Sequence, residues 1–403
     1  MHRVCINRQM QTISIIYSIK NMKIAYCIPQ ISHPGGIERV IIHKANYLAE
    51  KLNYDVCIIT VDNKDSLPYY SLSAKIKHID LNINYCDTLS LPLHKRFIIR
   101  KVLQQKHKKS LKKFLLNNKF DIVISTFQQE ASFLYKIKDG SKKLLECHFC
   151  KGYKSIIAKY YNYSILTKIA YRYKSWYDEY FIPNHYDKMI VLTEEDFKNW
   201  EHNTSNLVCI PNPLSFTTNQ TAKLDNKTVI AVGRYDAQKG FDRLLYIWRT
   251  VIDKCPEWHL NLYGQGEDEK LLLEIIKKLS LSKYVTLHPP YNNIKEKFLE
   301  SSIAVMPSRF EGFGLVLTEA MECGLPCVAF AFPCGAKDII KNKSDGFYIE
   351  NNNNEEFAKK LILLMTNSKL RKNFGKQAKI NVQRFSDEII MNKWNNLFIE
   401  ILK

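Results

Sequence analysis

The sequence predicts an α/β protein made of two doubly wound domains in tandem, and three observations support this fold class. Short apolar runs rich in β-branched residues alternate with longer amphipathic stretches, as in parallel sheets covered by helices on both faces. A polar segment at 215–227 divides this alternation into two series. The 403 residues exceed one ordinary domain, and hydrophobic and charged fractions of 46% and 25% are typical of globular proteins.

The expected strands follow from the short apolar runs. In the first series they are expected at 23–28, 56–61, 121–125, 188–192 and 207–210, and in the second at 229–232, 260–263, 285–287, 303–306 and 326–330. A last helix is expected after the N-cap Ser386. We therefore expect an N-terminal extension (1–21), a first domain (22–210), a second domain (211–385) and a terminal helix (386–403).

The composition limits the partners and the chemistry of the chain. Lys and Arg exceed Asp and Glu by 59 to 40, a net charge of +19, and most of the surplus lies before residue 210. A positive field favours anionic partners, but no zinc-finger, RNA-recognition or helix-turn-helix signature indicates nucleic acid. The eleven cysteines show no repeated spacing and are expected as reduced thiols, with no metal site at Cys147 and Cys150. The apolar run at 13–19 is too short to span a bilayer.

Glycines follow the first expected strand of each series. Gly35 and Gly36 open a helix, where they would let a ligand approach backbone N–H groups, although a plain turn also needs glycine. The segment 233–240 combines Arg234 and Lys239, a fork-shaped and a point cation that suit a diphosphate. A solvated charged loop is the alternative for this segment.

The segment 307–321 joins a strand end, a glycine-rich turn and a helix. Such a turn offers free N–H groups and the positive end of the helix dipole to a phosphate. Glu311 precedes the helix and Glu319 lies inside it, and either carboxylate could accept hydrogen bonds from a pair of sugar hydroxyls. The alternative for Glu311 is a helix cap.

These motifs together resemble retaining glycosyltransferase family 4, which has the GT-B fold. The Glu311-to-Glu319 spacing matches the E-x7-E pattern of that family, and the segments 233–240 and 263–266 and the glycines at 35–36 agree with it. The resemblance implies two Rossmann-like domains facing a cleft, with a C-terminal helix that crosses back to the first domain. It also implies that no metal or other cofactor is needed beyond the nucleotide-sugar donor substrate.

The resemblance assigns roles to individual residues. Arg234 and Lys239 would bind the donor diphosphate and stabilise the leaving nucleotide, and Glu311 would contact the transferred sugar. His148 stands where the family often has a histidine near the reactive carbon, or it merely ends a strand. The implied catalytic residues are Glu311, Arg234, Lys239 and His148, and the implied donor-binding residues are Gly35, Gly36, Arg234, Lys239, Gly264, Glu311, Gly312, Phe313, Gly314, Leu315 and Glu319.

The donor and the acceptor are expected from further segments. The stretch 332–340 is similar to one in bacterial members that use UDP-sugars for lipopolysaccharide or capsule, although Ala336 replaces their usual proline. We therefore expect transfer of a hexose or N-acetylhexosamine from a UDP-sugar to a lipid-linked or surface glycan. A GDP-sugar transferase of the same fold and an inactive basic scaffold are the alternatives.

A basic stretch at 92–114 contains no acidic residue, and its apolar side chains recur at roughly helical spacing. Such a helix is typical of membrane-surface binding, and the tyrosines and tryptophan at 160–180 would favour the headgroup layer. A cytoplasmic protein, peripheral at the inner face of the cytoplasmic membrane, is expected. The residues expected at an anionic membrane are Lys95, Arg96, Arg100, Lys101, Lys108, Lys109, Lys112 and Lys113.

Overall fold

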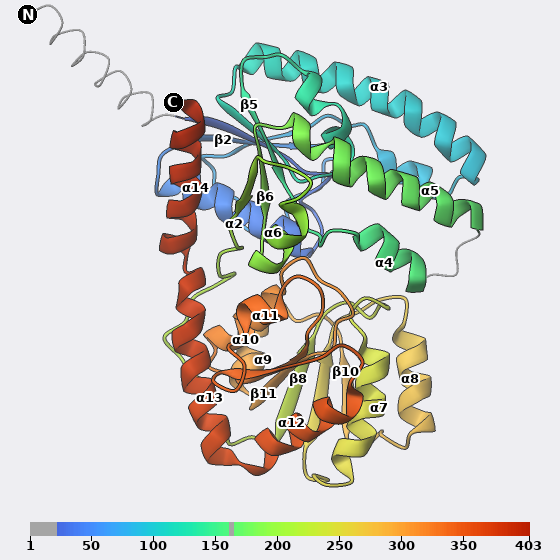
Figure 1. The fold of residues 1–403 in the computed structure, drawn as a ribbon, viewed down its shortest axis with the longest axis vertical. Helices are drawn as coiled ribbons and strands as arrows, with labels where there is room; N and C mark the ends of the chain where they lie inside the picture. Colours follow the sequence, from blue (N-terminus) through green and yellow to red (C-terminus); the bar gives the residue numbers. More distant parts are fainter. Residues whose placement is uncertain (1–21, 161–164) are drawn as a thin grey trace, which may run out of the picture.

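The computed structural model describes residues 22–160 and 165–403, so the expected extension at 1–21 lies outside the described residues. Two parallel sheets lie one beyond the other along the long axis of the molecule, each with helices packed around it (Figure 1). The prediction of two doubly wound α/β domains is confirmed.

The first sheet has seven parallel strands in the order β3-β2-β1-β4-β5-β6-β7. The chain builds outward from β1 in one direction and then in the other, so the order reverses between β1 and β4. The strands are β1 (Lys23–Cys27), β2 (Asp55–Thr60), β3 (Lys77–Asp80), β4 (Ile122–Ser125), β5 (Lys142–Glu146), β6 (Lys188–Val191) and β7 (Leu207–Cys209).

The second sheet has six parallel strands in the order β10-β9-β8-β11-β12-β13, which reverses between β8 and β11. Ligands of open α/β sheets bind outside the carboxyl ends of the strands at such reversals. The strands are β8 (Thr228–Val232), β9 (His259–Tyr263), β10 (Val285–His288), β11 (Ile303–Met306), β12 (Cys327–Phe330) and β13 (Gly346–Ile349).

Helices cover both faces of each sheet. Those of the first part of the chain are α2 (Gly36–Glu50), α3 (Leu93–Asn118), α4 (Tyr153–Tyr160), α5 (Ile165–Trp176) and α6 (Glu194–Trp200). Those that follow are α7 (Phe241–Ile252), α8 (Glu269–Lys278), α9 (Ile294–Leu299), α10 (Leu315–Glu322), α11 (Ala336–Ile339), α12 (Asn354–Thr366), α13 (Ser368–Asn381) and α14 (Asp387–Leu402).

Three strands, β3, β5 and β13, were not among those expected from the sequence. β3 and β13 form edges of their sheets, where an apolar run on both faces is not needed. β5 reads Lys-Lys-Leu-Leu-Glu, and two of its three charges can be buried because each has a partner: Lys143 pairs with Asp139 and Glu146 pairs with Lys44.

The last helix, α14, leaves the second sheet and runs back along the first, as Figure 1 shows. It packs on α2, where Trp394 is buried and Asp387 lies 2.7 Å from His43. The two segments that connect the sheets are hydrogen-bonded to each other, with the N–H of Leu214 donating to the carbonyl of Phe385 at 2.9 Å. The first sheet is therefore covered by residues from both ends of the described chain.

Candidate active site

The two sheets direct the carboxyl ends of their central strands toward each other, and the predicted site residues lie there. In the second sheet, Lys239 follows β8 and Glu311 follows β11, and Lys239 Nζ lies 2.7 Å from Glu311 Oε1. Both side chains are largely buried. Gln238 donates from Nε2 to the carbonyl of Phe310 at 3.1 Å, and the N–H of Arg309 donates to the carbonyl of Gln238 at 2.8 Å, so the backbones of the two loops are also joined.

Arg234 lies in the same loop as Lys239 but in a different environment. Its guanidinium is 3.0 Å from Asp236 Oδ2 and 3.2 Å from Gln238 Oε1, and 70% of the side chain is exposed. An exposed guanidinium can turn to a ligand at small cost, because it gives up only weak surface contacts. The structure thus brings Arg234, Lys239 and Glu311 together as one fixed ion pair and one exposed cation.

The glycine-rich turn before α10 is held from below by α7. Arg243 donates from Nε to the carbonyl of Pro307 at 2.7 Å, and from a terminal nitrogen to that of Ser308 at 2.5 Å. Gly314 is the N-cap of α10 with φ of 110°, in the left-handed region that favours glycine. The N–H groups of Phe313, Gly314 and Leu315 therefore stand at the positive end of this helix.

The first domain meets this turn backbone to backbone. A Cβ atom added to Gly312 would lie 1.9 Å from the carbonyl oxygen of His148, which follows β5. One added to Gly36 would lie 3.5 Å from the Cδ1 atom of Leu315. Gly312 is thus required for the approach of the two domains, and Gly36 lies beside Leu315 at the start of α10.

The other predicted glycines have local roles. A Cβ at Gly264 would lie 1.9 Å from the carbonyl oxygen of Gly233, so Gly264 allows the loops after β8 and β9 to pack together. A Cβ at Gly35 would collide with the carboxylate of Glu38, which folds back over the start of α2. Burial raises the pKa of Glu38, and the charges of His33, His148 and Arg234 act against this rise.

Glu319 forms an ion pair with Arg39 of the first domain. The guanidinium of Arg39 in α2 contacts Glu319 Oε1, and its carbon lies 5.2 Å from the ring centre of Tyr70. The Glu319 carboxylate is almost fully buried, and its charge raises the pKa of Arg39. Sequence reasoning missed Arg39, although its position three residues after Gly36 puts both on one face of α2.

His148 lies at the junction of the two domains, beside a buried carboxylate. Its Nε2 atom is 3.2 Å from Glu146 Oε1, within ion-pair distance but without the geometry of a hydrogen bond. Burial raises the pKa of Glu146, but the charges of Lys44 and His148 outweigh it and hold that pKa at about 2. His148 and Glu311 are thus brought to the same junction of the two domains.

The basic stretch expected as a helix forms α3, but its apolar residues do not make a single stripe. In α3, Leu111 and Leu115 are buried, whereas Phe97, Ile98 and Val102 are exposed. Arg96 and Arg100 turn back to donate to Thr88, so they contribute less to an outer surface than predicted. Exposed basic side chains of α3 are Lys95, Lys101, Lys106, Lys109, Lys112 and Lys113, and Lys108 is partly exposed.

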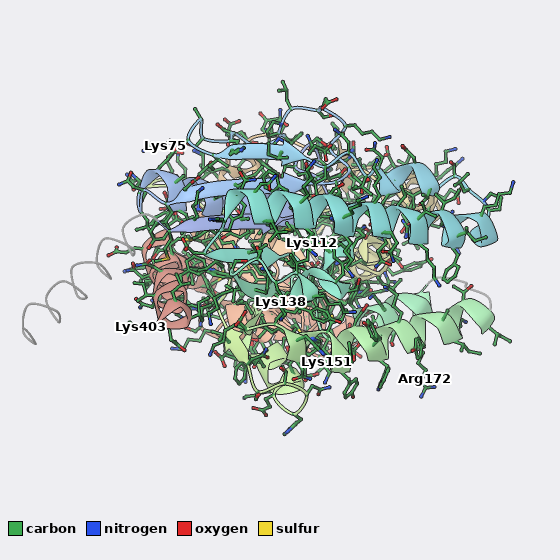
Figure 2. All side chains as sticks on the ribbon, turned by 90° about the horizontal axis from the view of Figure 1, so that it is seen from above. Lys75, Lys112, Lys138, Lys151, Arg172 and Lys403 are labelled. Carbon is green, nitrogen blue, oxygen red and sulfur yellow. The ribbon has the colours of Figure 1, made fainter. Side chains whose placement is uncertain are left out.

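Exposed aromatic residues add to this side of the molecule. Tyr173, Trp176 and Tyr180 are each at least half exposed. Figure 2 looks onto the first domain from the end away from the second, with Lys112 on α3 and Arg172 on α5 labelled. Both helices extend along the side of the first domain away from α14.

Two further features concern thiols and metals. The ten cysteines within residues 22–160 and 165–403 are all free, including Cys147 and Cys150. Across the same residues, the structure contains no group of three or more His, Cys, Asp or Glu side chains that could hold a metal ion. None of the helices in the described part of the chain is long and apolar enough to cross a membrane.

Solved structures of the same architecture define the class. Sucrose-phosphate synthase from Thermosynechococcus elongatus superposes with a TM-score of 0.76 at 18% identity, over 94% of this chain and 99% of the other. S. aureus TarM, crystallised with fondaparinux, alpha-GlcNAc-glycerol and UDP, superposes with a TM-score of 0.74 at 16% identity, over 94% and 100%. The chain has the GT-B architecture.

Sequence relatives define the family. The family model described as glycosyl transferases group 1 matches residues 216–381. An uncharacterized glycosyltransferase of Haemophilus influenzae is 31% identical over 380 residues, covering 93% of this chain and 99% of the relative. The amylovoran biosynthesis glycosyltransferase AmsD of Erwinia amylovora is 35% identical over 222 residues, covering 52% and 62%. The chain belongs to the group 1 glycosyl transferases and is a glycosyltransferase.

Proposed function

We propose that this protein is a retaining glycosyltransferase of family 4 that moves a hexose or N-acetylhexosamine from a UDP-sugar to a glycan acceptor. The observation that carries the proposal is the meeting of three groups at one junction. The Lys239–Glu311 ion pair, the start of α10 and the first-domain loop with His148 converge around Gly312. Cations, a helix N-terminus and carboxylates together suit a ligand that joins a diphosphate to polyhydroxylated sugars.

The roles follow from charge and position. Lys239 and Arg234 neutralise the diphosphate as negative charge develops on the leaving nucleotide, which is the kind of electrostatic stabilisation that contributes most in many enzymes. The N–H groups at the start of α10 add to that stabilisation without a metal ion. Glu319 accepts from the ribose hydroxyls once Arg39 moves aside, and Glu311 and His148 contact the transferred sugar.

UDP is the proposed nucleotide. The stretch 332–340 resembles that of UDP-sugar-using bacterial enzymes, and TarM was crystallised with UDP. Another structural neighbour, Alr3699/HepE from Anabaena, was crystallised with UDP and glucose. GDP stays the alternative nucleotide.

A surface glycan is the proposed acceptor, within lipopolysaccharide or capsule-type polysaccharide synthesis. AmsD is named for amylovoran biosynthesis. Another relative, the poly(ribitol-phosphate) alpha-N-acetylglucosaminyltransferase of Staphylococcus aureus, is 31% identical over 220 residues. The basic first domain would hold a lipid-linked acceptor at the inner face of the cytoplasmic membrane, with the exposed lysines of α3 against anionic headgroups.

Calorimetric titration with UDP, GDP, ADP and dTDP, without added metal, tests the donor assignment. Selective binding of UDP is the expected result, and UDP conjugates would then be screened for transfer. Retention would be read from the anomeric proton coupling of the product. Selective GDP binding would overturn the nucleotide assignment alone, whereas failure to bind any nucleotide would favour an inactive scaffold.

A further inference from the structure

A buried ion pair lies beneath the candidate active site, on the face of the first sheet that α2 and α14 cover. Lys44 of α2 contacts Glu146 at the end of β5, and neither side chain is exposed to solvent. The Lys44 ammonium also lies 4.1 Å from the ring centre of Trp394 in α14 and 5.4 Å from that of Tyr26 in β1.

The strand register explains why these residues meet. Tyr26 pairs with Ile124 of β4, and Ile124 pairs with Leu144 of β5. Glu146 lies two residues beyond Leu144 and so faces the same side of the sheet as Tyr26. The Glu146 carboxylate thus lies in the apolar layer between the first sheet and the helices α2 and α14 that cover it.

Stability alone does not account for this pair. Taking two charges out of water costs about as much as their attraction returns, and apolar residues of similar volume often serve a core as well or better. The polar groups around the pair are also incompletely satisfied, because Glu146 Oε2, His148 Nε2 and the hydroxyl of Tyr26 are buried and have no hydrogen-bond partner in the structure. Buried polar atoms left without a hydrogen-bond partner indicate that the pair has a role other than stabilising the fold.

The second neighbour of Glu146 indicates that role. Glu146 Oε1 faces not only Lys44 but also His148 Nε2, 3.2 Å away. The carbonyl of His148 in turn abuts Gly312, next to Glu311. A continuous series of contacts therefore leads from the core of the first domain to the glycine-rich turn of the second.

We propose that Glu146 is a positioning residue that orients the His148 imidazole for the transferred sugar, and that Lys44 keeps Glu146 ionised for this purpose. The inference rests on the proposed function, which places His148 at the sugar. A carboxylate beside one ring nitrogen fixes which nitrogen carries the proton. The nearby negative charge favours a proton on Nε2 through electrostatics, since the 3.2 Å contact lacks hydrogen-bond geometry, and Nδ1 is then the ring atom left for a ligand.

The test compares Glu146→Gln with a matched control, Asp139→Asn. Asp139 pairs with Lys143, a second buried ion pair whose lysine side chain lies on the opposite face of β5 from Glu146. Each variant removes one buried carboxylate charge. If Glu146→Gln does not fold, the double variant Lys44→Met with Glu146→Gln removes both charges and takes its place.

The first readout is the side-chain ¹⁵N spectrum of histidine-labelled protein, with the His148 signals assigned by their loss in His148→Asn. Glu146→Gln is expected to shift these signals and to lower kcat about 10- to 100-fold, by analogy with the loss when the carboxylate partner of a metal-bound histidine is removed. UDP affinity is expected to stay unchanged. Asp139→Asn is expected to leave the His148 signals and kcat as they are.

Two results would overturn the inference: unmoved His148 signals in Glu146→Gln, or an equal loss of kcat in the control. The spectrum needs no substrate. If the unmodified protein transferred no sugar from any nucleotide donor, the proposed function would fail, and the spectrum would still decide whether Glu146 orients His148.

Discussion

The contact between Gly312 and His148 allows the effect of a single methyl group to be calculated. In Gly312→Ala the new Cβ would lie 1.9 Å from the His148 carbonyl oxygen and 2.6 Å from its carbon. Cβ contacts below 3.0 Å are essentially never found. Both atoms belong to the His148 backbone, which lies on the other domain from Gly312, so the domains must separate by about 1 Å at this point.

The separation should affect catalysis far more than folding. A misplacement of about 1 Å in an active site can cost about 100-fold in rate, which corresponds to about 2.7 kcal/mol of activation free energy. We therefore expect kcat to fall about 100-fold. The Tm should change little, because the clash arises between domains and not within a core.

The assay is single-turnover transfer from a UDP-sugar, with UDP affinity and Tm measured in parallel. Gly375→Ala is the matched control, because its Cβ would lie 2.3 Å from the carbonyl oxygen of Gly324, inside the second domain. That variant should lower the Tm and leave kcat nearly unchanged. Unaltered kcat in Gly312→Ala would refute the view that this close contact is needed for turnover.

Four further predictions concern other charges. Lys239→Met and Arg234→Met should each weaken UDP binding by about 10-fold or more, since each removes a charge-assisted contact. Only Lys239→Met should also lower the Tm, because only Lys239 is buried against a carboxylate, and equal Tm losses would contradict this. Arg39→Met should tighten UDP binding about fivefold, or by about 1 kcal/mol, because the ribose no longer competes with the Arg39 guanidinium for Glu319. Weaker UDP binding in calorimetry would contradict the assignment of Glu319 to the ribose. Burial raises the pKa of Glu130 to about 7, so between about pH 4.5 and 7 the folded state keeps a proton that the unfolded state has lost. The free energy of unfolding should therefore fall over this range by up to about 3 kcal/mol. Glu130→Gln should flatten this part of the profile of Tm against pH, and an unchanged slope would exclude Glu130 as its source. Reversing the charges of Lys108, Lys109, Lys112 and Lys113 should release the protein from anionic vesicles in sedimentation assays, each residue contributing about 1 kcal/mol, and binding retained at moderate salt would rule out α3 as the membrane surface.

The sequence predicted the parts of the fold whose cause is local. Strands such as β1 and β8 are apolar because both faces are covered, and the glycines after them mark the ends where ligands bind. Residues Arg234, Lys239 and Glu311 could be grouped because each follows a central strand of one sheet. Their roles stay predictions.

What depends on contacts between distant segments could not be predicted. β5 could not be recognised as a strand from its sequence, because the charges of Lys143 and Glu146 interrupt the apolar run. Those charges are neutralised by partners elsewhere in the chain, Asp139 and Lys44 of α2. The Arg39–Glu319 pair joins residues 280 positions apart, and no local pattern indicates it. The apolar residues of α3 look like one stripe in sequence, but its two halves have different neighbours: the second half packs in the core while the first does not.

The return of α14 to the first sheet has a consequence for how the protein is made. Trp394, which covers Lys44, is synthesised almost last, after the whole second domain. At about 5–20 residues per second, roughly 10–40 s pass between completion of β7 and release of α14 from the ribosome. During that time the nascent first domain exposes an apolar face with a charged lysine at its centre, so chaperone capture should concentrate there. Any truncation that removes α14 would leave this face open permanently.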